Sequence, residues 1–221
     1  MKPIRILFTG DSITDAHRTT LNHALGQTDT FGTGYPLFIA ARLAAEKPGR
    51  FEVLNRGVSG NRIVDLDARV KCDCIHLQPD IVSIMIGIND VWHEIMARNG
   101  VDLEKFKRVY TSMLREIQAA LPHVRLMLLS PYVLPGTATQ EHLDIFQQET
   151  SARRAAVKEL ATAFHAAYLD TQALFDQACS PSIPASTWSL DGVHPTPAGQ
   201  WLLAEHWLQL FNTVCSHSHA V

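Results

Sequence analysis

The amino-acid sequence predicts an α/β fold in which helices cover both faces of a parallel sheet. Along the 221 residues, short apolar segments alternate with longer segments whose apolar residues recur at helical spacing. The segment 81–88 carries apolar side chains on both of its faces, as a central strand between two helix layers does. Because strands joined by helices run in the same direction, these two observations indicate a parallel sheet.

The predicted elements follow one another in a regular order. Five strands are expected over residues 4–8, 51–54, 81–88, 124–129 and 168–170. Long helices are expected over residues 35–47, 62–78, 103–121 and 141–164 and from 197 onward, with shorter ones after residue 12 and around residue 174. In the last helix, Trp201 and Trp207 are predicted to face the core. Arg153, Arg154 and Lys158 are predicted to face solvent.

Five strands connected in this way are expected to have the order 2-1-3-4-5, which is that of a flavodoxin-like three-layer α/β/α sandwich. In such a sheet the active crevice lies outside the carboxyl ends of the strands, where the strand order reverses. Ser12, Gly60 and Asn89 each follow one of the first three strands. We therefore expect these residues to meet at one edge of the sheet.

The composition favours a single domain over residues 1–221, with a polar tail from about residue 213. Hydrophobic residues make up 46% of the chain, which is enough for one sizeable core. The formal net charge of -3 provides no electrostatic footprint for nucleic acid or an anionic membrane, so neither is expected as a partner. No apolar run approaches the roughly 20 residues that span a bilayer.

The start of the chain and the cysteines both favour a cytoplasmic protein. Residues 1–3 lead directly into the first strand, and Arg5 interrupts what would be the apolar part of a secretory signal. The cysteines lack the spacing of a redox or zinc motif and are expected to be free thiols. They are Cys72, Cys74, Cys179 and Cys215.

Ser12 stands where the first strand ends and a helix is expected to begin. A serine at such a junction is either the N-cap of the helix or a nucleophile that projects from the carboxyl edge of the sheet. The N-terminus of the helix would stabilise negative charge that develops beside it. Ser12 alone does not decide between the two roles, so the choice depends on residues elsewhere in the chain.

A serine nucleophile needs a base, and an acid that orients the base. His194 precedes Pro195, which favours an extended backbone and leaves the imidazole projecting at a helix entrance. Asp191 lies three residues earlier, close enough to reach Nδ1 and leave Nε2 for Ser12, although it could equally bond only its own turn. Asp170 is a rival acid because it follows a strand, but it is better placed to cap the next helix.

Two further positions could stabilise an oxyanion. Asn89 directly follows a buried strand and can aim its side-chain amide into the crevice, and Gly60 lets a backbone N–H approach without a Cβ in the way. With the N–H of Ser12, these groups make three donors around one oxygen. Each residue also has a purely structural alternative, which is an Asx turn for Asn89 and a positive φ for Gly60.

Four short blocks span the chain from end to end: Gly10-Asp11-Ser12, Gly60, Gly87-Ile88-Asn89-Asp90 and Asp191-Gly192-Val193-His194-Pro195. Together they resemble the SGNH (GDSL) hydrolase family, which is named after its Ser, Gly, Asn and His. The resemblance implies Ser12 as nucleophile, His194 as base and Asp191 as its partner. It also implies an oxyanion hole made by the N–H groups of Ser12 and Gly60 with the Asn89 amide, and no metal or organic cofactor.

Three stretches, 31–35, 55–61 and 83–92, are similar to intracellular acetylxylan esterases of the SGNH type, which remove acetyl groups from xylo-oligosaccharides. His93 stands where that branch tends to have an arginine, and Arg62 stands where it tends to have a smaller residue. We expect both side chains to lie at the rim of the site and to influence substrate choice.

Several other side chains are predicted to bind the substrate. Aromatic rings stack well on sugar faces, and three of them are candidates for a wall beside Ser12. They are Trp92, Trp188 and Tyr132. Asp11, next to Ser12 in the sequence, is predicted to be a further substrate-binding residue.

The sequence therefore predicts a serine carboxylic-ester hydrolase that acts through an acyl-enzyme on small acetylated saccharides. A lysophospholipase or acyl thioesterase is the alternative within the enzyme class, and it would need a long apolar groove beside Ser12. A non-catalytic carbohydrate-binding protein is the alternative outside that class. Trp and Phe residues on the last helix suit a core or a homo-oligomer interface equally well.

Overall fold

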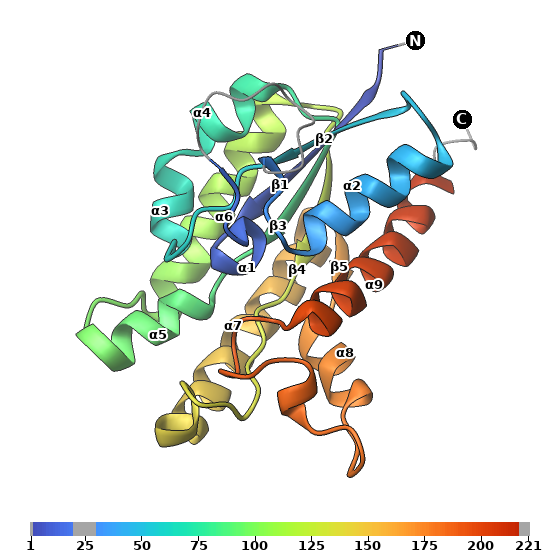
Figure 1. The fold of residues 1–221 in the computed structure, drawn as a ribbon. Coiled ribbons are helices and arrows are strands. Elements are labelled where there is room, and N and C mark those ends of the chain that lie inside the picture. Colours follow the sequence, from blue (N-terminus) through green and yellow to red (C-terminus); the bar gives the residue numbers. More distant parts are fainter. Residues whose placement is uncertain (1, 20–29, 217–221) are drawn as a thin grey trace.

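In the computed structural model, which describes residues 2–19 and 30–216, one five-stranded sheet runs through the molecule (Figure 1). All neighbouring strands are parallel, and their order is β2-β1-β3-β4-β5. The strands are β1 (Ile4–Gly10), β2 (Phe51–Asn55), β3 (Ile81–Met85), β4 (Arg125–Leu129) and β5 (Ala167–Leu169). The predicted fold class and strand order are confirmed.

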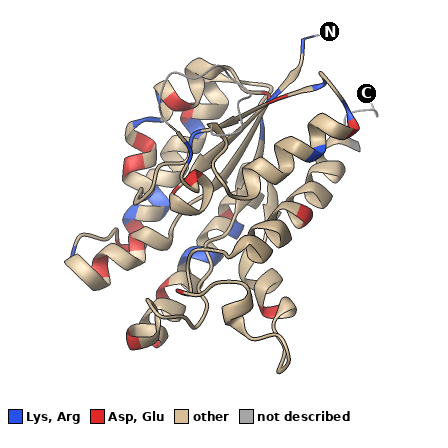
Figure 2. Cartoon of the chain, in the orientation of Figure 1, with Lys and Arg blue, Asp and Glu red and all other residues tan. Residues whose placement is uncertain are grey.

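Helices cover both faces of this sheet and complete a three-layer sandwich (Figure 1). One face carries α2 (Tyr35–Glu46), α8 (Thr171–Ala178) and α9 (Pro197–Ser216). The other carries α3 (Ile63–Ala68), α4 (Val70–Asp73), α6 (Leu103–Ala120) and α7 (Leu143–Ala163). The remaining elements are α1 (Ser12–Asp15), α5 (Ile88–Ala97), η2 (Ile75–Leu77), η3 (Gln140–His142) and η4 (Ala185–Thr187). In Figure 2, α3 and α5 carry acidic residues only, whereas acidic and basic residues are interspersed along α6.

The side chains of β1 show how the sheet separates two apolar clusters. Successive residues of a strand point to opposite faces. Phe8 packs against Tyr35 and Trp207 on one face, while Leu7 belongs to the cluster on the other. Ser83, a polar residue of β3, is buried and accepts a hydrogen bond from the Trp207 indole N–H at 2.9 Å. Aromatic packing and a satisfied buried polar group thus fix α9 on the sheet.

The register of the strands brings three chain segments to the same edge. Gly10 of β1 pairs with Met85 of β3, and Phe8 of β1 pairs with Asn55 of β2. All three strands therefore end close together, and they run in the same direction. The segments that follow them, which are α1, the loop to α3 and the start of α5, leave the sheet at this edge.

Two predicted elements are divided differently in the structure. The helix expected over 62–78 is broken into α3, α4 and η2, and the first break falls at Arg69, whose backbone leaves helical geometry (φ -112°, ψ 6°). The strand expected over 81–88 ends earlier, because Gly87 adopts φ 130° and precedes α5. Asn89 therefore lies in the first turn of a helix.

Two side chains lie opposite to their predicted environments. Trp201 was expected in the core but is 42% exposed, with its ring edge-on to Phe38 at 5.6 Å. Arg153 was expected to face solvent but is only 2% exposed. Its guanidinium donates hydrogen bonds to the carbonyl groups of Val101 and Glu149 and pairs with the Glu149 carboxylate at 2.8 Å, which balances its charge, while its buried Nε has no partner among the described residues.

The end of the chain differs in part from the prediction. α9 continues to Ser216 and so includes the first residues of the predicted polar tail, while residues 217–221 lie outside the described part. All four cysteines are free, as predicted. None of the helices within residues 2–19 and 30–216 is long and apolar enough to cross a membrane.

Candidate active site

Ser12 is the first residue of α1, just beyond the carboxyl end of β1. The N-cap of this helix is Asp11, whose carboxylate accepts a hydrogen bond from the Ile13 N–H at 3.0 Å. The Ser12 hydroxyl is therefore not used as the cap. Its Oγ atom lies 2.8 Å from Nε2 of His194, which is 182 residues further along the chain.

His194 and Asp191 lie in one turn before α9. Oδ2 of Asp191 is 2.6 Å from Nδ1 of His194, while Oδ1 accepts the backbone N–H groups of Val193 at 2.9 Å and His194 at 2.7 Å. One carboxylate thus stabilises the turn and orients the ring. Because Nδ1–H donates to Asp191, Nε2 is left to accept the Ser12 hydroxyl proton. We call Ser12, His194 and Asp191 the triad.

The hydrogen bonds of the triad shift the pKa values of both titratable groups. Burial alone would raise the pKa of Asp191, but hydrogen bonds from the His194 ring and from two backbone N–H groups outweigh it and hold this pKa well below its usual range. The hydrogen bond with Asp191 raises the pKa of His194, against the partial burial that lowers it. The imidazole is thus more basic than a free histidine and is paired with an acid that stays ionised.

The segment that follows β4 holds the turn of Asp191 in place. Leu134 donates its N–H to the Gly192 carbonyl at 2.8 Å. Gly136 allows the two segments to approach closely, because a Cβ at this position would lie 2.1 Å from the Gly192 nitrogen. The buried hydroxyl of Ser189 accepts the Gly192 N–H at 3.0 Å and lies 3.1 Å from Oδ1 of Asp191. The turn is therefore supported from both sides.

Residues 56–62 connect β2 to α3, and we call them the Gly60 loop. Gly60 has φ 81°, which favours glycine, and a Cβ at this position would have no atom within 4 Å. Within the described part of the chain, the N–H groups of Gly60 and Ser12 donate no hydrogen bond to the protein. Asn89 reaches the loop from α5 and donates one amide hydrogen to the Asn61 carbonyl at 3.1 Å. Its second amide hydrogen remains for another acceptor.

Sequence reasoning missed three charged residues that fix the Gly60 loop, of which Arg18 donates to the Gly57 carbonyl at 2.7 Å. Asp15 accepts the Ser59 N–H at 2.9 Å and the Ser59 hydroxyl at 2.6 Å. Arg69 donates to the Arg56 carbonyl at 2.8 Å and to Oδ1 of Asn61 at 2.7 Å. Asp15 and Arg69 carry no local signal, since Asp15 resembles an ordinary first-turn acid and Arg69 a solvent-facing residue of an amphipathic helix. Only their tertiary contacts distinguish them.

Two residues predicted to bind the substrate are buried beneath the site. Tyr132 has no exposed surface, and its hydroxyl donates to the Val193 carbonyl at 2.5 Å, so it does not form part of an aromatic wall. Asp11 is 1% exposed, and burial raises its pKa to about 7 although the Ile13 N–H opposes the increase. Both predictions are wrong, because Tyr132 supports the His194 turn and Asp11 caps α1.

Arg62, which was also predicted to bind the substrate, has its guanidinium engaged with protein acceptors. It donates to both carboxylate oxygens of Asp65 at 2.8 and 3.0 Å. It also donates to the carbonyl and side-chain oxygens of Asn99 at 2.7 and 2.9 Å. Arg62 therefore links the Gly60 loop to the segment after α5 and is not a free cation at the rim. His93 lies half-buried on α5.

The two tryptophans predicted to contact the substrate are both half-buried. The Trp92 ring lies 5.9 Å from that of His194, tilted by 47°, and packs edge-on against Phe146. The Trp188 indole N–H donates to the Ala178 carbonyl at 3.2 Å. Trp92 thus borders the triad directly, and a role for either ring in binding the substrate stays a prediction.

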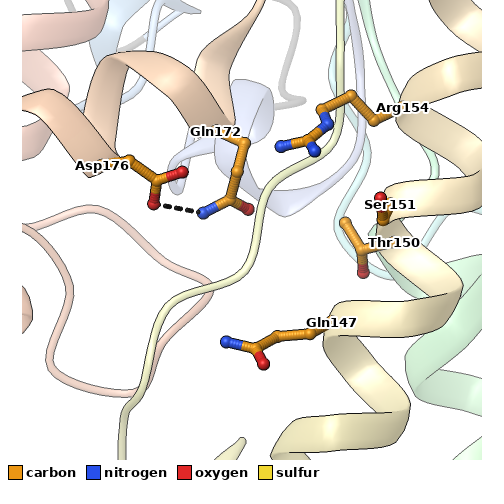
Figure 3. Close-up of a pocket in the computed structure, with 6 residues that line it drawn as sticks. All are labelled: Gln147, Thr150, Ser151, Arg154, Gln172 and Asp176. Carbon is orange, nitrogen blue, oxygen red and sulfur yellow. Dashed lines mark hydrogen bonds between the residues drawn. The ribbon is translucent and has the colours of Figure 1, made fainter.

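A polar cavity of about 290 Å³ lies between α7 and α8 and is separate from the triad (Figure 3). Its lining residues are Gln147, Thr150, Ser151, Arg154, Gln172 and Asp176. Figure 3 shows the Gln172 amide pointing at Asp176, to which it donates at 2.9 Å, and its Oε1 accepts the Val133 N–H at 3.0 Å. Gln172 thereby ties α8 to the segment after β4. In the part of the chain that the structure describes, no group of three His, Cys, Asp or Glu side chains could hold a metal ion.

Comparison with known proteins identifies the family to which this chain belongs. The model of the GDSL-like lipase/acylhydrolase family matches residues 8–202, which include the triad, Gly60 and Asn89. The chain belongs to this family. The GDSL-like hydrolase is therefore a serine carboxylic ester hydrolase, as the sequence predicted.

Several known proteins resemble this GDSL-like hydrolase over nearly their whole length. An acetylxylan esterase from Geobacillus stearothermophilus is 34% identical over 211 residues, which cover 93% of this chain and 92% of the relative. The crystal structure of Axe2, an acetylxylan esterase from the same organism, superposes with a TM-score of 0.82 at 32% identity, covering 95% and 96% of the two chains. A protein from Parabacteroides merdae described as a GDSL-like lipase has a TM-score of 0.89 at 33% identity, covering 95% of each chain.

Proposed function

We propose that this GDSL-like hydrolase removes O-acetyl groups from small acetylated sugars through an acetyl-enzyme on Ser12. The observation that carries the proposal is the continuous row of hydrogen bonds from Ser12 Oγ to His194 and from His194 to Asp191, at 2.8 and 2.6 Å. A serine held on an imidazole that is itself held by a carboxylate is activated for acyl transfer. Similarity to an acetylxylan esterase supports acetylated sugars as the substrate class.

In the first half of the proposed reaction, Ser12 Oγ attacks the carbonyl carbon of the acetyl group while Nε2 of His194 takes the hydroxyl proton. The Asp191 carboxylate stabilises the imidazolium that forms. Collapse of the tetrahedral intermediate breaks the bond to the sugar oxygen, and His194 gives its proton to that oxygen. The sugar leaves as an alcohol, and the acetyl group stays on Ser12.

Three donors are proposed to stabilise the oxyanion of this intermediate. They are the backbone N–H groups of Ser12 and Gly60 and the second amide hydrogen of Asn89. The two N–H groups have no acceptor within the described part of the protein, and the bond from Asn89 to the Asn61 carbonyl fixes the direction of the amide. Losing a single donor of this kind typically costs about 3–4 kcal/mol of transition-state stabilisation.

In the second half of the reaction, water replaces the sugar. Nε2 of His194 takes a proton from the water as its oxygen attacks the acetyl carbonyl carbon. The bond to Ser12 Oγ then breaks, His194 returns the proton to Oγ, and acetic acid leaves and ionises to acetate. Both halves begin with a neutral His194, so the protonation state of this ring controls the rate.

The pH dependence of the reaction is expected to report the pKa of His194. A protonated ring cannot accept the Ser12 proton, so kcat/KM falls as the pH drops through this pKa. Because the hydrogen bond with Asp191 raises the pKa of His194, the midpoint is expected above the ordinary histidine value of about 6.5. The measurement is kcat/KM for p-nitrophenyl acetate over a pH series. A midpoint below that of free histidine would show that another group controls the rate.

The acyl and alcohol preferences are tested with one substrate series. Nitrophenyl esters of increasing acyl length, acetylated xylo-oligosaccharides, other acetylated sugars and acyl thioesters are assayed side by side, with Ser12→Ala as the blank. We expect the rate to peak at acetate, and acetate to be released from the sugars. A long acyl groove would gain about 0.8 kcal/mol for each buried CH₂. A rate that rises with chain length, or a preference for thioesters, would therefore support a lysophospholipase or thioesterase instead.

A further inference from the structure

We propose that Arg69 is a positioning residue that holds the Gly60 loop against the end of β1 and so fixes the geometry of the oxyanion hole. The inference rests on the proposed function, because it concerns the backbone donors of Ser12 and Gly60. Arg69 lies outside the four sequence blocks that mark the family. Its role follows from its contacts in the folded chain.

The Arg69 guanidinium joins two separate segments at the active edge of the sheet. Nη1 donates to the Arg56 carbonyl at 2.8 Å, and Nε donates to Oδ1 of Asn61 at 2.7 Å. Arg69 thus binds the Gly60 loop near both of its ends. Nη2 donates to the Gly10 carbonyl at 3.1 Å, two residues before Ser12. One side chain therefore links the loop to the strand that presents Ser12.

The local structure around Arg69 suits this contact. Asp73, four residues later, accepts a hydrogen bond from Nη1 at 2.9 Å and balances the guanidinium charge. Arg69 is itself the residue at which the predicted helix breaks between α3 and α4. A guanidinium is planar and presents its donors in a fixed fork, so acceptors bound to one guanidinium keep fixed positions relative to one another.

The Gly60 loop depends on polar anchors, because packing at its tip is sparse. A Cβ at Gly60 would meet no atom within 4 Å. Asp15 holds the N–H and hydroxyl of Ser59, and Asn89 holds the carbonyl of Asn61. These contacts secure the middle and the far end of the loop, while its first residues are held by backbone hydrogen bonds to β1 and by Arg18, which donates to the Gly57 carbonyl at 2.7 Å. The Arg69 side chain reaches both ends of the loop and the end of β1 at once.

The two backbone donors of the proposed oxyanion hole come from the two segments that Arg69 joins. The Ser12 N–H follows β1, and the Gly60 N–H lies within the loop. Without Arg69, the first residues of the loop keep their backbone hydrogen bonds to β1. These run from the Arg56 N–H to the Phe8 carbonyl at 2.7 Å and from the Val58 N–H to the Gly10 carbonyl at 3.0 Å. The Asn61 side chain, however, loses its tie to them. A displacement of the Gly60 N–H by about 1 Å is enough to cost on the order of 10²-fold in rate. The loss is expected in kcat, because the oxyanion exists in the transition state and not in the bound ester.

A kinetic test compares Arg69→Met and Arg69→Lys with Lys71→Met. Lys71 is a matched control, since it is a cation of α4 whose side chain is 74% exposed. With p-nitrophenyl acetate, both Arg69 variants are expected to lower kcat by about 10- to 100-fold while KM stays within about threefold of wild type. Lysine is not expected to restore the rate, because it lacks the fork. Lys71→Met is expected to behave like the wild type.

Hydrogen–deuterium exchange provides a second readout that does not depend on turnover. Peptides covering the Gly60 loop are expected to exchange faster in both Arg69 variants than in Lys71→Met, while peptides of α6 and α9 exchange as in the wild type. An Arg69→Lys variant with wild-type kcat, or with unchanged exchange in the loop, overturns the inference. Failure of the proposed function would give a different result: Ser12→Ala would hydrolyse the ester at the wild-type rate in the same assay. In that case the exchange result still decides whether Arg69 holds the loop.

Discussion

Ser12→Ala is expected to lower kcat/KM for acetyl esters by about 10⁴- to 10⁶-fold. The substitution removes the Oγ atom that lies 2.8 Å from Nε2 of His194 and is proposed to form the acetyl-enzyme. Residual hydrolysis is expected, because the oxyanion donors and His194 remain. The melting temperature is expected to change little, since Asp11 and not Ser12 caps α1. Initial rates and thermal melting measure the two effects separately.

Two further variants make this result specific. Ser151→Ala removes an exposed serine hydroxyl of α7 and is expected to leave the rate unchanged. The double variant Ser12→Ala/His194→Ala is expected to be about as slow as Ser12→Ala alone, because residues of a triad act as a unit. Losses that multiply in the double variant would contradict this coupling. A Ser12→Ala rate within about tenfold of wild type would contradict the role of Ser12 itself.

Asp191→Asn is expected to lower kcat/KM by about 10⁴-fold. Oδ1 of Asp191 accepts two backbone N–H groups, so the single oxygen of the amide is expected to stay there and turn its NH₂ toward Nδ1 of His194. When this NH₂ group donates to Nδ1, Nδ1 must be the unprotonated ring nitrogen, and the single ring proton lies on Nε2. Nε2 of His194 then carries a proton toward Ser12 and cannot accept the proton of the Ser12 hydroxyl. Steady-state rates measure the loss.

The control for Asp191→Asn is Asp176→Asn, which neutralises an exposed carboxylate of α8. Asp191→Ala adds a second comparison, because it also removes the acceptor that stabilises the turn. We expect Asp191→Ala to lower the melting temperature, and Asp191→Asn to keep it near the wild-type value. Equal rates for Asp191→Asn and Asp176→Asn would show that Asp191 does not orient His194.

The arrangement of the sheet could be predicted because parallel strands joined by helices allow few topologies. A segment with apolar residues on both faces had to be a central strand, and β3 is one. Local capping was equally predictable, since Asp170 accepts the Ala173 N–H at 3.1 Å as the N-cap of α8. These features depend on periodicity and on local hydrogen bonding, which a single sequence contains.

The positions of Ser12, Gly60 and Asn89 at one edge could also be predicted, because each follows a strand and the strands run in the same direction. Asp191 and His194 were harder, since their turn is not attached to a strand of the sheet. Their closeness in sequence supplied the missing constraint, and the structure shows the expected hydrogen bond between Oδ2 and Nδ1.

Tertiary contacts account for what the sequence did not indicate. Tyr132 and Trp201 are both large aromatic residues, yet Tyr132 is fully buried against the turn of the triad and Trp201 is substantially exposed. Arg153 and Arg69 occupy positions that an amphipathic pattern assigns to solvent, and both instead bind backbone carbonyl groups of distant segments. A helical period cannot reveal such acceptors, because they come from other parts of the chain.

The most direct test of the account is covalent labelling with a fluorophosphonate, which reacts with an activated serine and does not turn over. Wild-type protein is labelled to completion, esterase activity is followed during labelling, and the labelled peptide is located by mass spectrometry. We predict that activity falls in proportion to labelling, that the label lies on Ser12, and that Ser12→Ala takes up none. Full esterase activity in a chain that takes up no label, or inactivation by a label on another residue, would contradict Ser12 as the nucleophile.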